Sequence, residues 1–240
     1  MRVHTDDTES QADGEPPLIE TIAHPAHEKE SAPAGRKMDI VIRAAWQLFL
    51  DQGFSATSMD AIAKVAGVSK ATLYAYFPSK EALFASLIVA ECESLQRDLP
   101  LPKLSAGLSE ALREFAKQYL HTFIHRKDVA FVRIIANESG RFPVLARLFY
   151  ESGPEATIRR LSQFLEEAKA AKLLEFDDSM EAAKQFLCLV RGEIPLLIVL
   201  GLSELTQETI EREIEAGLRF FLKACQPTTP RGQRGTGGSS

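Results

Sequence analysis

Residues 57–84, TSMDAIAKVAGVSKATLYAYFPSKEALF, contain the pattern that decides the fold of this 240-residue chain. Thr57 is placed to cap a short helix, and Asp60, three residues later, would complete a capping box. Gly67 then allows a tight turn, and Ser69 is placed to cap a second short helix. Two short helices joined by a turn of about three or four residues that contains glycine form a helix-turn-helix. The stretch therefore predicts that motif.

The second short helix, expected over residues 70 to 77, carries side chains that suit contact with DNA. Lys70 can reach the acceptor atoms of guanine, and Ala71 can touch the methyl group of thymine. The hydroxyl groups of Thr72, Tyr74 and Tyr76 can bond phosphates. Because the two tyrosines lie about 200° apart around a helix, we expect one of them to pack against the first helix of the domain.

Lys80 falls in the first turn of the following helix, where free backbone N–H groups and an ammonium group favour a phosphate oxygen. A helical hairpin that merely packs is the alternative interpretation of the motif, but it does not explain two tyrosines beside a lysine. Arg36 and Lys37 are either an arm that enters the minor groove or solvated charges.

The stretch GVSKATLYAYFPSK, residues 67–80, resembles the recognition-helix signature of TetR-type repressors. The likeness extends over residues 37–85. The resemblance implies a DNA-binding homodimer in which Lys70, Ala71 and Tyr74 read bases or their flanks. Ala75 stands where many members have a larger polar side chain, which leaves fewer direct base contacts. By the same resemblance, the residues that would hold the DNA backbone are Thr57, Ser58, Thr72, Tyr76 and Lys80.

Composition divides the chain into two tails and two folded parts. Residues 1–34 are acidic and aperiodic, and residues 227–240 are rich in Pro, Gly, Ser and Thr, so both are expected to be disordered. Residues 35–82 are assigned to the helix-turn-helix domain, and residues 83–226 to a domain for effector binding and dimerisation. The net charge of −5 conceals six bases and three acids over residues 36–80, which favours phosphate contact.

Apolar residues recur at helical spacing throughout the folded parts, and no alternating strand pattern occurs. We predict an all-α fold, with a three-helix N-terminal helix-turn-helix domain and a larger C-terminal bundle, about nine or ten helices in all. Asp178 and Thr206 have the character of helix starts, and Pro195 predicts a kink or an opened turn. Outside the motif, helices are expected over residues 36–51, 79–97, 105–125, 128–138, 142–151, 154–173, 179–200 and 207–225.

The segment from Phe131 to Pro154 resembles the C-terminal region of AefR-like repressors, a subgroup of the same family. This resemblance implies a pocket for a small-molecule effector but does not identify the molecule. Ordinary bundle core explains the candidate lining residues equally well. These candidates are Phe115, Tyr119, Phe123, Phe131, Ile134 and Ile135.

Two pairs of polar residues in the C-terminal half have alternative interpretations. His121 and His125 share a helix face and could ligate a metal, but no acidic third ligand follows, so a solvated pair is preferred. No metal or other cofactor is predicted. Arg191 and Glu193 interrupt an apolar helix and either contact an effector or pair across a dimer seam. We favour the seam.

The last two helical patterns have broad apolar faces. Two such helices from each subunit would form a four-helix dimer interface, as is usual in the TetR family, and packing within one chain is the alternative. The residues of these faces are Phe186, Leu189, Leu197, Ile214, Leu218, Phe221 and Leu222.

These features together predict an effector-responsive transcriptional regulator, specifically a repressor, that binds a roughly palindromic DNA operator as a homodimer. A small molecule would release it from DNA. The alternative is a DNA-binding protein that has no ligand and acts through a protein partner. An enzyme is not predicted, because no nucleophile elbow, phosphate loop or dense His/Asp/Glu cluster occurs.

The remaining composition narrows the setting in which the chain works. The three cysteines are widely spaced, which argues against a disulfide framework or a zinc finger and favours buried or half-buried reduced thiols. The chain has neither a signal-peptide core nor an apolar stretch that could span a bilayer. We therefore expect a cytoplasmic protein without a membrane partner.

Overall fold

The computed structural model describes residues 33–124, 126–202 and 206–227, with side chains except those of 33–36 and 122–128. The two predicted disordered tails lie outside the described residues, apart from the short ends that enter α1 and follow α11. Within the described residues there are helices and no strands, which confirms the all-α prediction.

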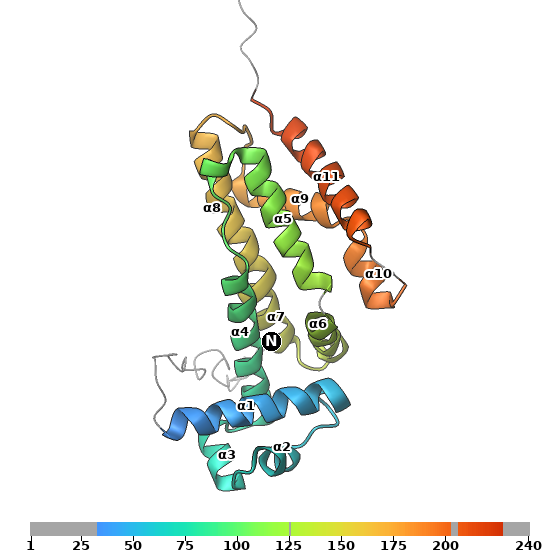
Figure 1. Cartoon of the computed structure of the whole chain (residues 1–240). Coiled ribbons are helices and arrows are strands. Elements are labelled where there is room, and N and C mark those ends of the chain that lie inside the picture. The colour runs from blue at the N-terminus through green and yellow to red at the C-terminus, as the bar shows by residue number, and fades with distance from the viewer. Residues whose placement is uncertain (1–32, 125, 203–205, 228–240) are drawn as a thin grey trace, which may run out of the picture.

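Eleven α-helical elements, one 3-10 turn and one π-turn make up the described chain (Figure 1). They are α1 (Pro33–Gln52), α2 (Met59–Ala66), α3 (Lys70–Tyr76), α4 (Lys80–Asp98), η1 (Leu104–Ala106), α5 (Leu108–Ile124), α6 (Arg126–Glu138), α7 (Pro143–Tyr150), η2 (Glu151–Glu155), α8 (Ala156–Ala170), α9 (Ser179–Arg191), α10 (Ile194–Leu200) and α11 (Gln207–Ala224).

The first three helices form a compact unit from which α4 rises into the C-terminal bundle (Figure 1). Gly67 ends α2 with a φ of 65°, a left-handed conformation that favours glycine, and so allows the tight turn into α3. Ser58, not Thr57, caps α2, because its side chain accepts a hydrogen bond from the N–H of Ala61. The predicted cap was therefore wrong by one residue.

An aromatic cluster forms the core of this N-terminal unit. The ring of Phe54 lies 5.4 Å from that of Phe49 and 4.8 Å from that of Phe84. Phe131 of α6 joins the same core and contacts Trp46 of α1 at a centroid distance of 4.9 Å. The core of the DNA-binding unit thus continues into α6, far beyond the end of the motif in the sequence.

The C-terminal bundle is built around α5, α8, α9 and α11, whose apolar faces share a second core. The predicted helix starts are confirmed: the Asp178 side chain accepts from two backbone N–H groups of α9, and Thr206 caps α11. The single helix predicted over residues 179–200 is wrong, because the chain breaks at Gly192 and Glu193. Pro195 lies in the first turn of α10, where the missing N–H is tolerated.

A continuous helical path replaces the two helices predicted over residues 142–151 and 154–173. The π-turn over Glu151–Glu155 joins α7 directly to α8. Pro154 lies inside this turn and has no N–H to donate, so the wider hydrogen-bonding pattern accommodates it. If α7, the π-turn and α8 are counted as one continuous helix, the described chain has ten helices, in agreement with the nine or ten predicted.

The predicted dimer faces of the last two helices are corrected by the structure. Phe186, Ile214, Leu218 and Phe221 are at most 2% exposed, because α9 and α11 pack against each other within one chain. Leu197 and Leu222 are half-buried, and Leu189 stays exposed as predicted. The exposed apolar side chains near these helices are Leu189, Leu196, Val199, Leu200, Leu202 and Phe220.

The cysteines are unpaired, and two of them follow the prediction. Cys92 and Cys225 are buried, but Cys188 is exposed on α9, so the expectation of a buried or half-buried thiol was wrong there. Burial raises the pKa of the Cys92 thiol to about 12, which keeps it protonated. Across the helices that the structure describes, none combines the length and apolar character needed to cross a bilayer.

Candidate nucleic-acid interface and ligand cavity

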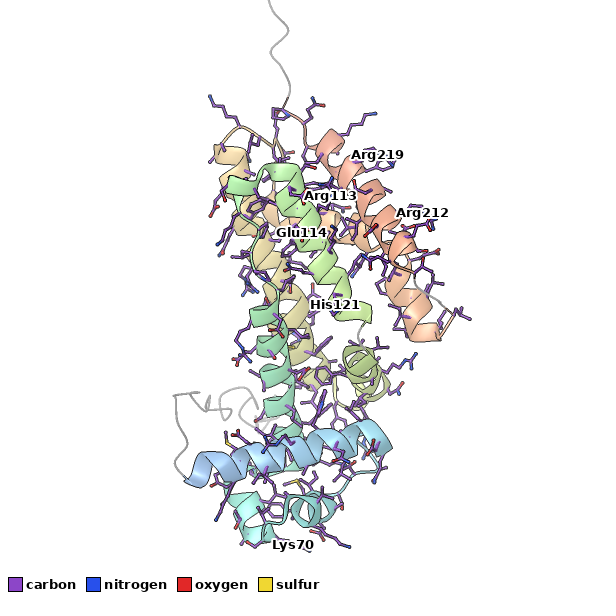
Figure 2. The ribbon with its side chains drawn as sticks, viewed as in Figure 1. Lys70, Arg113, Glu114, His121, Arg212 and Arg219 are labelled. Atoms are coloured by element: carbon purple, nitrogen blue, oxygen red, sulfur yellow. The ribbon has the colours of Figure 1, made fainter. Side chains whose placement is uncertain are left out.

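Caps and a buried leucine hold α3 with one face outward. The Ser69 hydroxyl accepts a hydrogen bond of 3.0 Å from the N–H of Thr72 and so begins the helix, while Leu73 is fully buried beneath it. Lys70 lies at the extreme end of the molecule (Figure 2). The exposed residues of α3 are Lys70, Ala71, Tyr74 and Ala75. This face offers an ammonium group, a phenol and two methyl groups to a partner.

The ammonium group of Lys70 is paired with an acid from the neighbouring helix. Its Nζ lies 2.6 Å from Oδ2 of Asp60, and both side chains are more than half exposed. The hydrogen bond and the charge of Asp60 raise the pKa of Lys70. Lys70 is therefore fully charged at neutral pH, but a carboxylate partly cancels its field.

The two tyrosines of α3 have different surroundings. Tyr74 is 48% exposed, whereas Tyr76 is half-buried and packs against the aromatic core. The prediction that one of the two packs inward is confirmed, and it is Tyr76. Thr72 is half-buried, and its hydroxyl lies 2.8 Å from that of Ser69. Ser58 and Lys37 are exposed, while the side chain of Arg36 lies outside the described residues.

Thr57 and Lys80 face inward, in contrast to the phosphate contacts predicted for them. Thr57 is 2% exposed, and its hydroxyl donates to the carbonyl of Gly53 at 2.8 Å. The Lys80 ammonium donates to the carbonyls of Phe54 and Thr57, each at 2.8 Å, and to that of Ser55 at 3.3 Å. It also lies 4.5 Å from the centre of the Phe54 ring.

This arrangement makes Lys80 a clamp on the turn between α1 and α2. Its three donors each have a backbone partner, so the side chain has no donor left for phosphate in this conformation. Partial burial lowers the pKa of Lys80, because the charged form loses hydration. The predicted phosphate contact is corrected accordingly: Lys80 supports the DNA-binding unit from within.

The same turn is fastened to α6. The backbone N–H of Ser55 donates to Oε1 of Glu138 at 3.2 Å, and the Ser55 hydroxyl donates to Oε2 at 2.9 Å. Nearby, the rings of Phe54 and Phe142 lie 5.2 Å apart. The turn before the helix-turn-helix is thus held both by Lys80 and by the end of α6.

A cavity of about 210 Å³ lies between α4, α6, the π-turn and α10. Most of its wall is aliphatic or aromatic. Its polar lining groups come from Gln96, Tyr119, Thr157 and Arg191. The apolar and small residues that line it are Cys92, Leu95, Leu99, Val129, Phe131, Val132, Phe149, Gly153, Pro154, Pro195, Ile198 and Val199.

Comparison with known families now decides the class of the protein. Residues 41–87 match the family described as bacterial regulatory proteins, tetR family. Residues 110–227 match the family described as AefR-like transcriptional repressor, C-terminal domain. This chain belongs to the TetR family. It is thus a transcriptional regulator with a DNA-binding helix-turn-helix.

Individual relatives agree with this assignment. A solved structure named Flavonoid-responsive Regulator FrrA is 90% identical, with a TM-score of 0.77 over 81% of this chain and 100% of that one. A putative TetR-family regulator from Mesorhizobium loti MAFF303099 is 23% identical, with a TM-score of 0.75 over 82% and 100%, and supports the fold alone.

Curated relatives match short stretches of this TetR-family chain. The regulator RutR of Escherichia coli strain K12 is 42% identical over 60 residues, which are 25% of this chain and 28% of RutR. The regulator YuxN of Bacillus subtilis strain 168 is 44% identical over 52 residues, which are 22% of this chain and 18% of YuxN. The chain therefore spans less than a third of the length of these curated relatives.

The predicted pocket residues of this TetR-family regulator divide into two groups. Tyr119 and Phe131 do line the cavity. Phe115, Ile134 and Ile135 do not: Phe115 is buried in the C-terminal core, and the two isoleucines pack in the N-terminal core. The correction has a simple cause, since α5 and α6 each turn only one side toward the cavity. The side chain of Phe123 lies outside the described residues.

The cavity also contains residues that sequence reasoning did not select or interpreted differently. Arg191 lines the cavity, which favours the effector alternative for this residue, while Glu193 is exposed. Gln96 and Thr157 were not selected, because a single polar residue on an amphipathic helix gives no signal of which cavity it reaches. His121 is exposed on α5 (Figure 2), and the side chain of His125 lies outside the described residues. Among the described His, Cys, Asp and Glu residues, no group of three could hold a metal.

Phe131 connects the cavity to the DNA-binding unit. One part of its ring lines the cavity, and the ring also packs against Trp46 of α1 and, at 6.4 Å between centroids, against Phe84 of α4. Phe149 closes the other side at 5.7 Å. A molecule in the cavity would therefore touch a side chain that is part of the helix-turn-helix core.

Proposed function

We propose that this TetR-family regulator is a repressor that binds a roughly palindromic operator as a homodimer and is released by a small aromatic molecule. The observation that carries the proposal is the exposed face of α3, placed at the extreme end of the molecule and joined through α4 and α6 to a largely apolar cavity. Because it acts on chromosomal DNA, such a repressor works in the cytoplasm.

For DNA contact we propose a reduced set of residues. Lys70, Ala71 and Tyr74 are exposed and would reach base edges or their flanks in the major groove. Ser58 and Thr72 are at the starts of α2 and α3, where backbone N–H groups add to phosphate binding. The support for excluding the side chains of Thr57, Tyr76 and Lys80 is their inward orientation.

A dimer would present two copies of α3 about one helical turn of DNA apart, so the operator would contain two inverted half-sites. The exposed apolar residues near α9 and α11 support this part of the proposal, because such side chains are commonly covered in an interface. Leu189 is 37% exposed and Phe220 is 67% exposed. Leu189 belongs to the predicted dimer face, and Phe220 takes the place of the buried Phe186 and Phe221 as a candidate contact.

For the effector we propose a flavonoid, a planar phenol with two or three rings. The similar protein FrrA is named as flavonoid-responsive, and it is 90% identical over 81% of this chain. The cavity agrees with such a molecule in its chemistry, because Phe131 and Phe149 supply aromatic walls and most of the lining is apolar. Release from DNA requires that the flavonoid bind one conformer better than the operator-bound one.

The first experiment selects bound sequences from random duplex DNA with the full chain. We expect an enriched site with two inverted half-sites, and release of that site by a flavonoid in a gel shift. In the variant Tyr74→Ala, operator affinity should fall about tenfold or more, with an unchanged melting temperature. Tyr150→Ala is the matched control, since Tyr150 on α7 is also 48% exposed. Equal affinity of the two variants would overturn the proposed role of α3.

A further inference from the structure

The polar groups of the cavity differ in how fully they are already bonded. Gln96 is saturated: its Nε2 donates to the carbonyl of Gly153 at 3.0 Å and to the hydroxyl of Thr157 at 2.7 Å. Its Oε1 accepts from Nη1 of Arg160 at 2.6 Å. An amide with both donors and its oxygen engaged has little to offer a ligand.

The partners of Gln96 are equally self-contained. The Thr157 hydroxyl donates to the carbonyl of Gly153 at 3.1 Å and accepts from Gln96. Arg160 is held by the carbonyl of Gln96 at 2.7 Å and by that of Leu99 at 3.0 Å. This corner joins α4 to the π-turn and α8, and it behaves toward a ligand as a closed wall.

Arg191, on the α9 side of the cavity, is less fully hydrogen-bonded than Gln96. Its side chain is half-buried, lines the cavity, and lies 3.5 Å from the sulfur of Cys188, a weak acceptor. It also forms a side-chain hydrogen bond with Tyr119. Burial raises the pKa of the Tyr119 phenol and so keeps that group protonated. A guanidinium has five donors in a planar fork, so several remain available.

The charge that the lining residues bring to the cavity is positive. Among the described residues that line it, Arg191 is the ionised group, and neither Asp nor Glu is among them. A positive charge in a largely apolar cavity favours an anionic guest, because charge-assisted hydrogen bonds are stronger where water is scarce. The aromatic rings of Phe131 and Phe149 would flank the body of that guest.

We infer that Arg191 is the residue that selects the effector, and that it binds an acidic oxygen, a phenolate or a carboxylate, on an aromatic molecule. This inference rests on the proposed function and deepens it, because it states which chemical group of a flavonoid the regulator recognises. Tyr119 orients the guanidinium as a positioning residue. The hydrogen-bonded group of Gln96, Thr157 and Arg160 shapes the cavity but does not contribute to ligand selectivity.

The test uses two matched pairs of probes and the full chain. The first pair is 7-hydroxyflavone, in buffer that ionises its phenol, and 7-methoxyflavone. The second pair is 2-naphthoate and its methyl ester. Binding is measured by titration calorimetry for the wild type, Arg191→Met, Arg191→Lys and the control Arg159→Met. Arg159 is an exposed residue of α8 that pairs with Glu155 and does not line the cavity.

We expect the acidic member of at least one pair to bind the wild type about 10- to 100-fold more tightly than its neutral match. Arg191→Met should erase that preference, Arg191→Lys should keep part of it, and Arg159→Met should keep all of it. Unchanged operator binding by Arg191→Met without any probe shows that the variant is folded. If Arg191→Met fails that check, Arg191→Lys and the wild-type preference decide.

The outcomes separate this inference from the proposed function. Equal affinity of acidic and neutral probes in both pairs, a preference that survives in Arg191→Met, or no binding by any probe overturns the role of Arg191. Release of the selected operator by the flavones is a separate readout. Failure of flavones to release it, with a naphthoate preference that depends on Arg191, overturns the flavonoid assignment and supports the acidic-oxygen inference.

Discussion

The helix pair α2 and α3 and the helix pair α9 and α11 each depend on a glycine, for different physical reasons. Gly67, between α2 and α3, has a φ of 65°, and a Cβ placed there would have no atom within 4 Å. Gly217 lies inside α11, and a Cβ there would overlap the carbonyl of Leu189 and come within 2.7 Å of the N of Val190. Gly67 supplies a conformation, and Gly217 supplies space.

This difference between a local and a long-range role explains why the structure around Gly67, but not that around Gly217, can be predicted from the sequence. A left-handed turn is a local event, so the residues around Gly67 identify it. The close approach of α9 and α11 joins residues almost thirty positions apart, and a glycine in an amphipathic helix gives no sign of what lies opposite. An added methyl group should cost more stability at Gly217 than at Gly67, since an open turn tolerates it better than a crowded helix crossing does.

The variant with the largest expected effect is Gly217→Ala. The added methyl group would have to push α9 away from α11 by displacing backbone, and overpacking of this kind costs about 3 kcal/mol. The free energy of unfolding should fall by that amount, and the melting temperature by roughly 10 °C. Urea denaturation followed by circular dichroism measures the first, and a thermal melt the second.

Gly140→Ala is the matched control, because no atom lies within 4 Å of the Cβ position of Gly140 and its φ is not in the left-handed region. Its stability should stay within about 0.5 kcal/mol of the wild type. If Gly217→Ala were as stable as Gly140→Ala, the α9–α11 crossing would be looser than the structure has it, and the contrast with Gly67 would disappear.

Local signals predicted most of the helix starts, and tertiary contacts explain the failures. Ser69, Asp178 and Thr206 cap helices as predicted, because a cap depends on residues within one turn. Thr57 precedes Ser58, and either could cap α2. The fold sends the Thr57 hydroxyl inward to the carbonyl of Gly53, so the serine remains as the cap.

In the functional sites too, features set by local sequence could be predicted, and features set by tertiary contacts could not. The exposure of Lys70 and Tyr74 follows from the helical pattern of α3, which buries Leu73. The clamp of Lys80 could not be predicted, because its three carbonyl partners lie more than twenty residues earlier in the chain. The cavity likewise combines single side chains from several helices, and their convergence depends on packing angles that no short motif specifies.

The variant Lys80→Met tests the clamp, with the second-largest expected effect. It keeps the apolar stem but removes the three donors, which leaves the partly buried carbonyls of Phe54 and Thr57 without those bonds. We expect a loss of about 2 kcal/mol in the free energy of unfolding and weaker operator binding, because the turn before α2 loosens. Chemical denaturation measures the stability, and gel shifts at several salt concentrations measure the binding.

The two interpretations of Lys80 give opposite results in this experiment. A direct phosphate contact would leave stability unchanged and reduce the slope of log affinity against log salt by about one. Lys117→Met is the control, since Lys117 pairs with Glu114 on the surface of α5, where a single ion pair contributes little. Its stability and its salt slope should both match those of the wild type.

The smallest expected effect belongs to Asp60→Asn and concerns the exposed end of the recognition unit. Asp60 holds the Lys70 ammonium at 2.6 Å and offsets its charge. Without the carboxylate, the ammonium would be drawn to phosphates of any sequence. Affinity for non-operator DNA should therefore rise a few-fold at low salt, with a salt slope steeper by up to about one.

Specificity, measured as the ratio of operator to non-operator affinity, should fall in Asp60→Asn while the melting temperature stays the same. Glu114→Gln changes the charge equally in another exposed ion pair, at the end of the molecule away from Lys70 (Figure 2). Fluorescence anisotropy with both DNA types should show no change in that control. An equal change in both variants would mean that net charge alone matters, whereas an effect confined to Asp60 would make this carboxylate a determinant of sequence selection.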